Sequence, residues 1–90
     1  MAERREIIFR GRVQGVGFRD TVRRTASRFE VAGTVRNEPD GTVRCIAEGE
    51  ATELDRFLEA VRTAMEANLS AVESRTVGVR GDLDGFRIVR

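Results

Sequence analysis

The hydrophobic period changes repeatedly along this 90-residue chain, and the order of the changes constrains the fold more than any other feature. In some segments apolar residues alternate with polar ones, as in strands, and in others they recur every three or four residues, as in helices. The clearest helical segment places five apolar residues on one face: Leu54, Phe57, Leu58, Val61 and Met65. From end to end, the periods give the order strand, helix, strand, strand, helix, strand, followed by one more short strand.

This order predicts an α+β fold, the ferredoxin-like βαββαβ sandwich, in which an antiparallel sheet carries two helices on one face and a short extra C-terminal strand follows. The predicted strands cover residues 6–14, 31–37, 42–48, 74–80 and 86–89, and the predicted helices cover residues 20–29 and about 52–65. Asp20 is a plausible N-cap of the first helix, and Thr52 with Asp55 resembles a capping box for the second. We expect one domain over residues 1–90, because a chain this short builds a single small core.

The composition excludes several kinds of site. The chain has no histidine and a single cysteine, which excludes histidine-based metal sites, Ser–His or Cys–His catalysis, a zinc cluster and an internal disulfide. All sixteen basic residues are arginine, yet the net charge is only +1, which does not favour a nucleic-acid or membrane surface. No apolar run is long enough for a signal peptide or a membrane span. We therefore expect a cytoplasmic monomer that binds neither nucleic acid nor a membrane.

The stretch GRVQGVGFR at residues 11–19 joins the first predicted strand to the first predicted helix. Glycines let successive backbone N–H groups turn toward one point, and a helix N-terminus adds donors, so the stretch can form an anion cradle. A cation such as Arg19 is unfavourable at a helix N-terminus, but a bound anion would turn it into a clamp. The alternative is a tight turn with a solvated arginine. The Walker A motif and the dinucleotide fingerprint are both absent, because Gly-Lys-Ser/Thr is missing and Asp20 replaces the third glycine.

Together with GTVRNEPDGTVRCIAEG at residues 33–49, this stretch resembles the two signatures of the acylphosphatase family, in order and at the expected separation. The resemblance implies the ferredoxin-like fold and the hydrolysis of carboxyl phosphates to a carboxylate and inorganic phosphate, without metal or cofactor. It implies that Arg19 is a catalytic phosphate clamp and that Asn37 is catalytic by orienting the attacking water. It also implies that the phosphate is bound by the backbone N–H groups of Gln14, Gly15, Val16, Gly17, Phe18 and Arg19.

The resemblance also implies the ligands that the chain binds: a small acyl phosphate as substrate, and inorganic phosphate as product and inhibitor. A non-catalytic module that binds an acyl phosphate or carbamoyl phosphate stays open, because related domains occur within larger hydrogenase-maturation proteins. Thr34 and the segment 66–70 depart from the family's usual pattern and bear on substrate fit.

Phe18 is expected to anchor the loop in the core, and Cys45 to be a small buried hydrophobe. RNA binding on such a sheet usually needs exposed aromatics, and this chain has five Phe and no Trp or Tyr.

Overall fold

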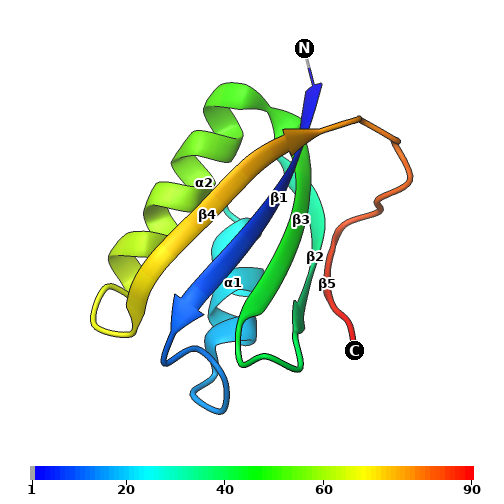
Figure 1. Cartoon of the computed structure of the whole chain (residues 1–90). Coiled ribbons are helices and arrows are strands. Elements are labelled where there is room, and N and C mark those ends of the chain that lie inside the picture. The colour runs from blue at the N-terminus through cyan, green and yellow to red at the C-terminus, as the bar shows by residue number, and fades with distance from the viewer. Residues whose placement is uncertain (1) are drawn as a thin grey trace.

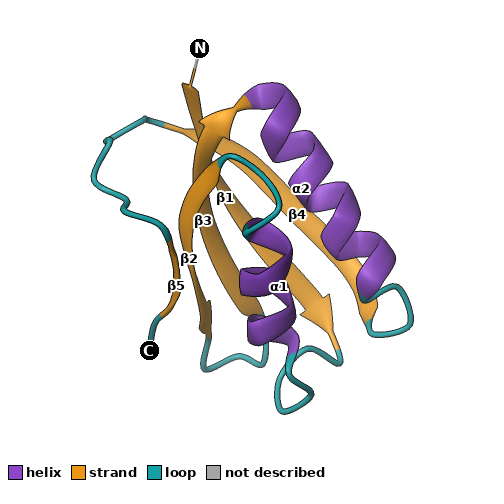
Figure 2. Ribbon diagram, turned by 180° about the vertical axis from the view of Figure 1, so that it is seen from behind, coloured by secondary structure: helices purple, strands orange, loops and turns teal. Residues whose placement is uncertain are grey.

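The structure, a computed structural model, describes residues 2–90 and has two layers, a five-stranded sheet and a pair of helices (Figure 1). The elements are β1 (Ala2–Gly11), α1 (Phe18–Ala26), β2 (Val31–Asn37), β3 (Val43–Glu50), α2 (Ala51–Ala64), β4 (Leu69–Val77) and β5 (Phe86–Ile88). Figure 2 shows both helices on the same side of the sheet, which leaves the other face open. The predicted ferredoxin-like α+β fold is therefore confirmed.

The sheet has the strand order β4-β1-β3-β2-β5. β1 pairs antiparallel with both β3 and β4, and β2 pairs antiparallel with β3. β5 instead runs parallel to β2, from Phe86 opposite Gly33 to Ile88 opposite Val35. The four strands β1–β4 are thus antiparallel as expected, and the extra strand β5 makes the sheet mixed. The reason is that β4 ends at the same end of the sheet at which β2 begins, so after the crossing to the opposite edge β5 starts at that end and runs in the direction of β2 (Figure 1).

The core lies between the sheet and the helices, where the predicted apolar faces meet. On β3 the buried residues alternate as predicted: Val43, Cys45 and Ala47. On α2 the predicted face is buried, with the last residue packed at its margin: Leu54, Phe57, Leu58, Val61 and Met65. All five phenylalanines lie in the core or pack against it, so none of them offers a stacking surface on the open face.

The first strand begins and ends earlier than the expected 6–14. Its charged first half pairs along β3, with Ala2 opposite Glu50. Residues 12–14 leave the sheet, because the N–H group of Arg12 donates to the carbonyl of Asn68 (2.8 Å) instead of continuing the ladder.

The fourth strand also begins earlier, at Leu69 instead of near residue 74. A tight turn after α2, in which the N–H groups of Asn68 and Leu69 donate to the carbonyl of Met65, returns the chain to the sheet at once. The first helix and the third and fifth strands differ from their predicted bounds by two or three residues at most at either end.

The N-terminus of α1 has no side-chain cap. Its N-cap is Gly17, and the predicted N-cap, Asp20, lies inside the first turn. The Asp20 carboxylate binds Arg23 and Arg24 of the same helix at 2.7 and 3.0 Å. The N-cap prediction is therefore wrong, and the first N–H groups of the helix stay without a side-chain acceptor.

The capping box predicted for α2 is also wrong. Glu50 is the N-cap and makes no side-chain cap hydrogen bond. The carboxylate of Asp55 instead binds Arg5 of β1 at 2.6 Å, which ties the helix to the sheet. α2 has 14 residues, and no helix within residues 2–90 is long and apolar enough to cross a membrane.

Candidate active site

Three connections lie at the end of the sheet where β1 and β2 finish (Figure 1). They are the glycine loop (residues 12–17) between β1 and α1, the hairpin turn (residues 38–42) between β2 and β3, and the turn between α2 and β4 (residues 65–68). Asn37 is the last residue of β2, and Arg19 is the second residue of α1. The fold thus brings both sequence signatures to one end of the molecule.

The glycine loop leaves a run of backbone donors free. Gly15 and Gly17 have φ angles of 74° and 76°, the left-handed conformation that is easy only for glycine. Within residues 2–90, no backbone N–H group of residues 14–19 donates a hydrogen bond. The run ends in the first turn of α1, whose N–H groups have no partner inside the helix. A series of free N–H groups at a helix N-terminus is an array that binds anions.

Contacts on both sides hold the loop in place. At its start, Arg12 and Asn68 exchange two hydrogen bonds: the Arg12 N–H donates to the Asn68 carbonyl (2.8 Å), and the Asn68 Nδ2 donates to the Arg12 carbonyl (3.0 Å). At its end, the Phe18 ring is fully buried and lies 5.0 Å from the Phe9 ring, centroid to centroid. Phe18 therefore anchors the loop as predicted, and the loop is tied to the rest of the fold at both of its ends.

Arg19 keeps its guanidinium free although its side chain is half-buried. Within residues 2–90 it makes no ion pair and no hydrogen bond. Several other arginines are neutralised by carboxylates on the open face of the sheet, where Arg44 and Arg75 share Glu6. An arginine without a carboxylate partner retains its planar set of donors for a bound anion.

Asn37 presents a buried acceptor without a donor. Its Oδ1 atom is shielded from solvent and has no hydrogen-bond partner within residues 2–90. An unsatisfied buried polar atom costs about 1–3 kcal/mol, so such an atom normally meets a water molecule or a ligand. Because ionised phosphate oxygens are acceptors, the group suited to this Oδ1 is a donor such as water.

The hairpin turn that follows Asn37 is held by side chains. The Thr42 hydroxyl and N–H group donate to Asp40 Oδ1 at 2.6 and 3.0 Å, and these hydrogen bonds lower the pKa of the Asp40 carboxyl. The side-chain amide of Gln14 donates to the carbonyls of Glu38 (2.8 Å) and Thr42 (2.9 Å). Gln14 therefore faces the hairpin with its side chain, and only its backbone N–H group is free for an anion.

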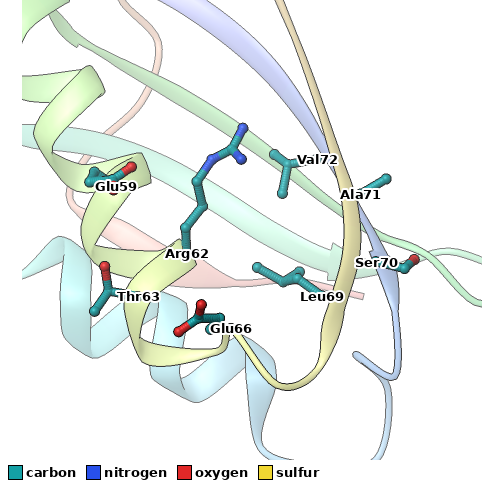
Figure 3. Close-up of a pocket in the computed structure, with 8 residues that line it drawn as sticks. All are labelled: Glu59, Arg62, Thr63, Glu66, Leu69, Ser70, Ala71 and Val72. Carbon is teal, nitrogen blue, oxygen red and sulfur yellow. The ribbon is translucent and has the colours of Figure 1, made fainter.

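A groove elsewhere on the surface does not suit an anion. It lies between α2 and β4, has a volume of about 320 Å³ and contains none of the predicted site residues. Arg62 extends across it from α2 toward Val72, with Glu59 on the helix and Glu66 in the turn that follows it (Figure 3). The groove is lined by two carboxylates and one guanidinium, so its net charge is negative, which disfavours an anionic ligand. Within residues 2–90, no group of three or more Cys, Asp or Glu side chains is arranged to hold a metal ion.

The family model for acylphosphatase matches residues 5–88. The chain belongs to the acylphosphatase family. An acylphosphatase of Salinibacter ruber is 44% identical over 81 residues, which cover 89% of this chain and 85% of that protein. The crystal structure of acylphosphatase from Bacillus subtilis matches with a TM-score of 0.87 and 34% identity over the whole of both chains. Full-length HypF in its phosphate- and nucleotide-bound form matches with a TM-score of 0.80 and 26% identity, over 100% of this chain and 12% of that one. The chain is accordingly an enzyme of the acylphosphatase type.

Sequence reasoning missed the two side-chain amides that hold the glycine loop. The family resemblance pointed only to the backbone N–H group of Gln14, and Asn68 falls in the segment 66–70 that departs from the family's pattern. The two carbonyls bound by the Gln14 amide lie 24 and 28 residues away along the sequence, and the carbonyl bound by the Asn68 amide lies 56 residues away. No local pattern in the sequence signals contacts across such separations.

Proposed function

We propose that the chain hydrolyses acyl phosphates without a metal ion, with the glycine loop and Arg19 binding the phosphate and Asn37 orienting the attacking water. The observation that carries the proposal is the run of free N–H groups at residues 14–19 beside an arginine that has no carboxylate partner. A cation at a helix N-terminus is unfavourable on its own. A phosphate between the two removes that conflict, since the helix end and the guanidinium then face the same negative charge.

The reaction asks little of the protein beyond binding and orientation. Water attacks phosphorus, the bond between phosphorus and the acyl oxygen breaks, and the carboxylate leaves with the electron pair. A carboxylic acid has a pKa near 4–5, so the leaving group needs no proton from a general acid. The proton of the water can pass to an oxygen of the phosphate itself. Charge on the equatorial phosphoryl oxygens is stabilised by preorganised donors, which is the main contribution that phosphoryl transfer requires.

Asn37 supplies the acceptor for the water. Its buried, unpartnered Oδ1 atom can accept a hydrogen bond from water and so direct a lone pair of the water oxygen toward phosphorus. A water molecule that is already held in line with the bond to be broken loses less translational and rotational entropy on reaching the transition state. Misplacement of the water by about 1 Å can lower the rate on the order of 100-fold.

A second candidate is a module that binds an acyl phosphate or carbamoyl phosphate without hydrolysing it. The likeness to a region of HypF favours this candidate. The acceptor at Asn37 argues against a module that only holds an acyl phosphate, because such a ligand has no donor for this oxygen, whereas the amino group of carbamoyl phosphate has.

Incubation of the purified chain with benzoyl phosphate in the presence of EDTA tests the proposal, with release of inorganic phosphate as the readout. We expect hydrolysis that EDTA does not abolish. Arg19→Ala should lose nearly all activity. Arg62→Ala is the control, because it removes a guanidinium from α2, outside the glycine loop, and its rate should be unchanged. Saturable binding of benzoyl phosphate without phosphate release would favour the binding module. Activity that disappears with EDTA and returns with magnesium would contradict the metal-free mechanism.

A further inference from the structure

The glycine loop depends on tertiary contacts for its position. Between Arg12, which is bound to Asn68, and Phe18, which is buried in the core, its backbone N–H groups make no hydrogen bonds within residues 2–90. The middle of the loop is therefore held by side chains, and the polar one among them is that of Gln14.

The amide of Gln14 is a double donor to the hairpin turn. Both of its hydrogen bonds come from Nε2, one to the Glu38 carbonyl at 2.8 Å and one to the Thr42 carbonyl at 2.9 Å. The same Thr42 carbonyl accepts the Glu38 N–H (2.9 Å), the hydrogen bond that closes the turn. Within residues 2–90, these are the hydrogen bonds that join the glycine loop to this turn. Asn37 directly precedes Glu38, so the amide of Gln14 links the phosphate donors to the backbone that carries Asn37.

We propose that Gln14 is a positioning residue: its side chain sets the placement of Asn37, and so of the attacking water, relative to the phosphate held by the loop. This inference rests on the proposed function. The Gln14 side chain points its donors at backbone carbonyls, so it does not itself bind the phosphate. The phosphate donors are the N–H groups of residues 14–19 and Arg19, and they survive the loss of this side chain.

This division of roles predicts a separation of kcat from phosphate binding. Gln14→Met keeps the length of the side chain and removes both donors. We expect it to lower kcat by about 10- to 100-fold, because small displacements of the nucleophile carry costs of that order. The inhibition constant for inorganic phosphate should stay within about threefold of the wild-type value, since none of its donors is removed. A role confined to stability would lower the urea midpoint and leave kcat of the folded protein unchanged.

Asn68→Ala is the matched control. It removes a side-chain amide that donates to the same loop at 3.0 Å, but on the side away from the hairpin turn. We expect a loss of stability comparable to that of Gln14→Met and a loss of kcat at least several-fold smaller. Equal losses of kcat in the two variants would mean that loop rigidity in general, and not the link to Asn37, is what matters, and would overturn the inference.

The deciding experiment is a double-mutant cycle on kcat for benzoyl phosphate, with Gln14→Met and Asn37→Ala made singly and together. If Gln14 acts by placing Asn37, the double variant should be no slower than Asn37→Ala alone, because there is no longer a water-orienting amide to misplace. Additive losses, or an unchanged kcat in folded Gln14→Met, would overturn the inference while leaving the proposed function intact. A wild-type protein that binds but does not hydrolyse benzoyl phosphate would overturn the proposed function, and the inference with it.

Discussion

Replacing Arg19 by alanine should separate phosphate binding from folding. Inorganic phosphate binds the folded chain, in our account, through the free N–H groups of residues 14–19 and the unpaired guanidinium. A ligand that binds only the folded state adds about 2.7 kcal/mol at one hundred times its Kd. For a domain of this size each kcal/mol raises Tm by about 4–8 °C, so phosphate at that concentration should raise the wild-type Tm by roughly 11–22 °C.

The variant should lose most of this gain. A hydrogen bond to a charged group contributes about 1.5–3 kcal/mol, so removing the Arg19 clamp should raise the phosphate Kd by roughly 13- to 160-fold. At the same phosphate concentration only about 0.3–1.3 kcal/mol of stabilisation then remains. Without phosphate, the variant should be as stable as the wild type or slightly more stable, because the substitution removes a cation from a helix N-terminus.

The assay is thermal unfolding followed by circular dichroism, with chloride at matched ionic strength as the reference salt. Arg62→Ala serves as the control, since Arg62 lies on α2, outside the glycine loop, and its loss should leave the phosphate-induced shift intact. An Arg19→Ala protein that retains the full shift would show that phosphate binds elsewhere, and the account of the glycine loop would be wrong.

Three further predictions concern stability and reactivity. Gly17→Ala should lower the free energy of unfolding by about 1 kcal/mol, because the new Cβ meets open space and only the left-handed φ is penalised; a urea midpoint at or above the wild-type value would contradict this. Hydrogen bonds from Arg44 and Arg75 hold the pKa of Glu6 below its ordinary value of 4.5, so Glu6 stabilises the fold above that pH and the contribution is lost as the pH falls through its folded pKa. The difference in stability between wild type and Glu6→Gln, measured by urea denaturation, should therefore be present at pH 7 and shrink toward pH 3; a constant difference would argue against the pairing. Burial raises the pKa of the Cys45 thiol to about 12, so the native protein should not react with a thiol reagent at pH 8 unless urea unfolds it.

The hydrophobic pattern predicted α2, where burial is complete, and missed the start of β4, where burial is partial. Leu54, Phe57 and Val61 predicted α2 correctly because each of them is buried. β4 is an edge strand whose partly buried residues are sparse, Leu69, Val72 and Val77, so no alternation marks its first five residues. The start of this strand is set by the turn after α2, which the periodicity does not encode.

The predicted helix caps failed for a reason connected with the site. Asp20 has the chemistry of an N-cap, but the N-cap of α1 is a left-handed glycine, and the carboxylate lies inside the first turn, where it binds arginines. A side-chain cap would occupy N–H groups that the proposed phosphate site needs. The two signatures predicted that residues 11–19 and Asn37 act together, and the fold places both at one end of the sheet. Their assigned roles stay predictions, and the amide of Gln14 could not be assigned from sequence because its partners lie on another hairpin.

The most direct test of the central claim is the fate of the oxygen atom that comes from water. Benzoyl phosphate hydrolysed by the wild-type protein in water enriched in ¹⁸O should give inorganic phosphate that carries one heavy oxygen and benzoate that carries none, as measured by mass spectrometry. This result follows if the glycine loop holds the phosphate and Asn37 directs water to phosphorus. Heavy oxygen in the benzoate would show that water attacks the carbonyl carbon, and would contradict the account.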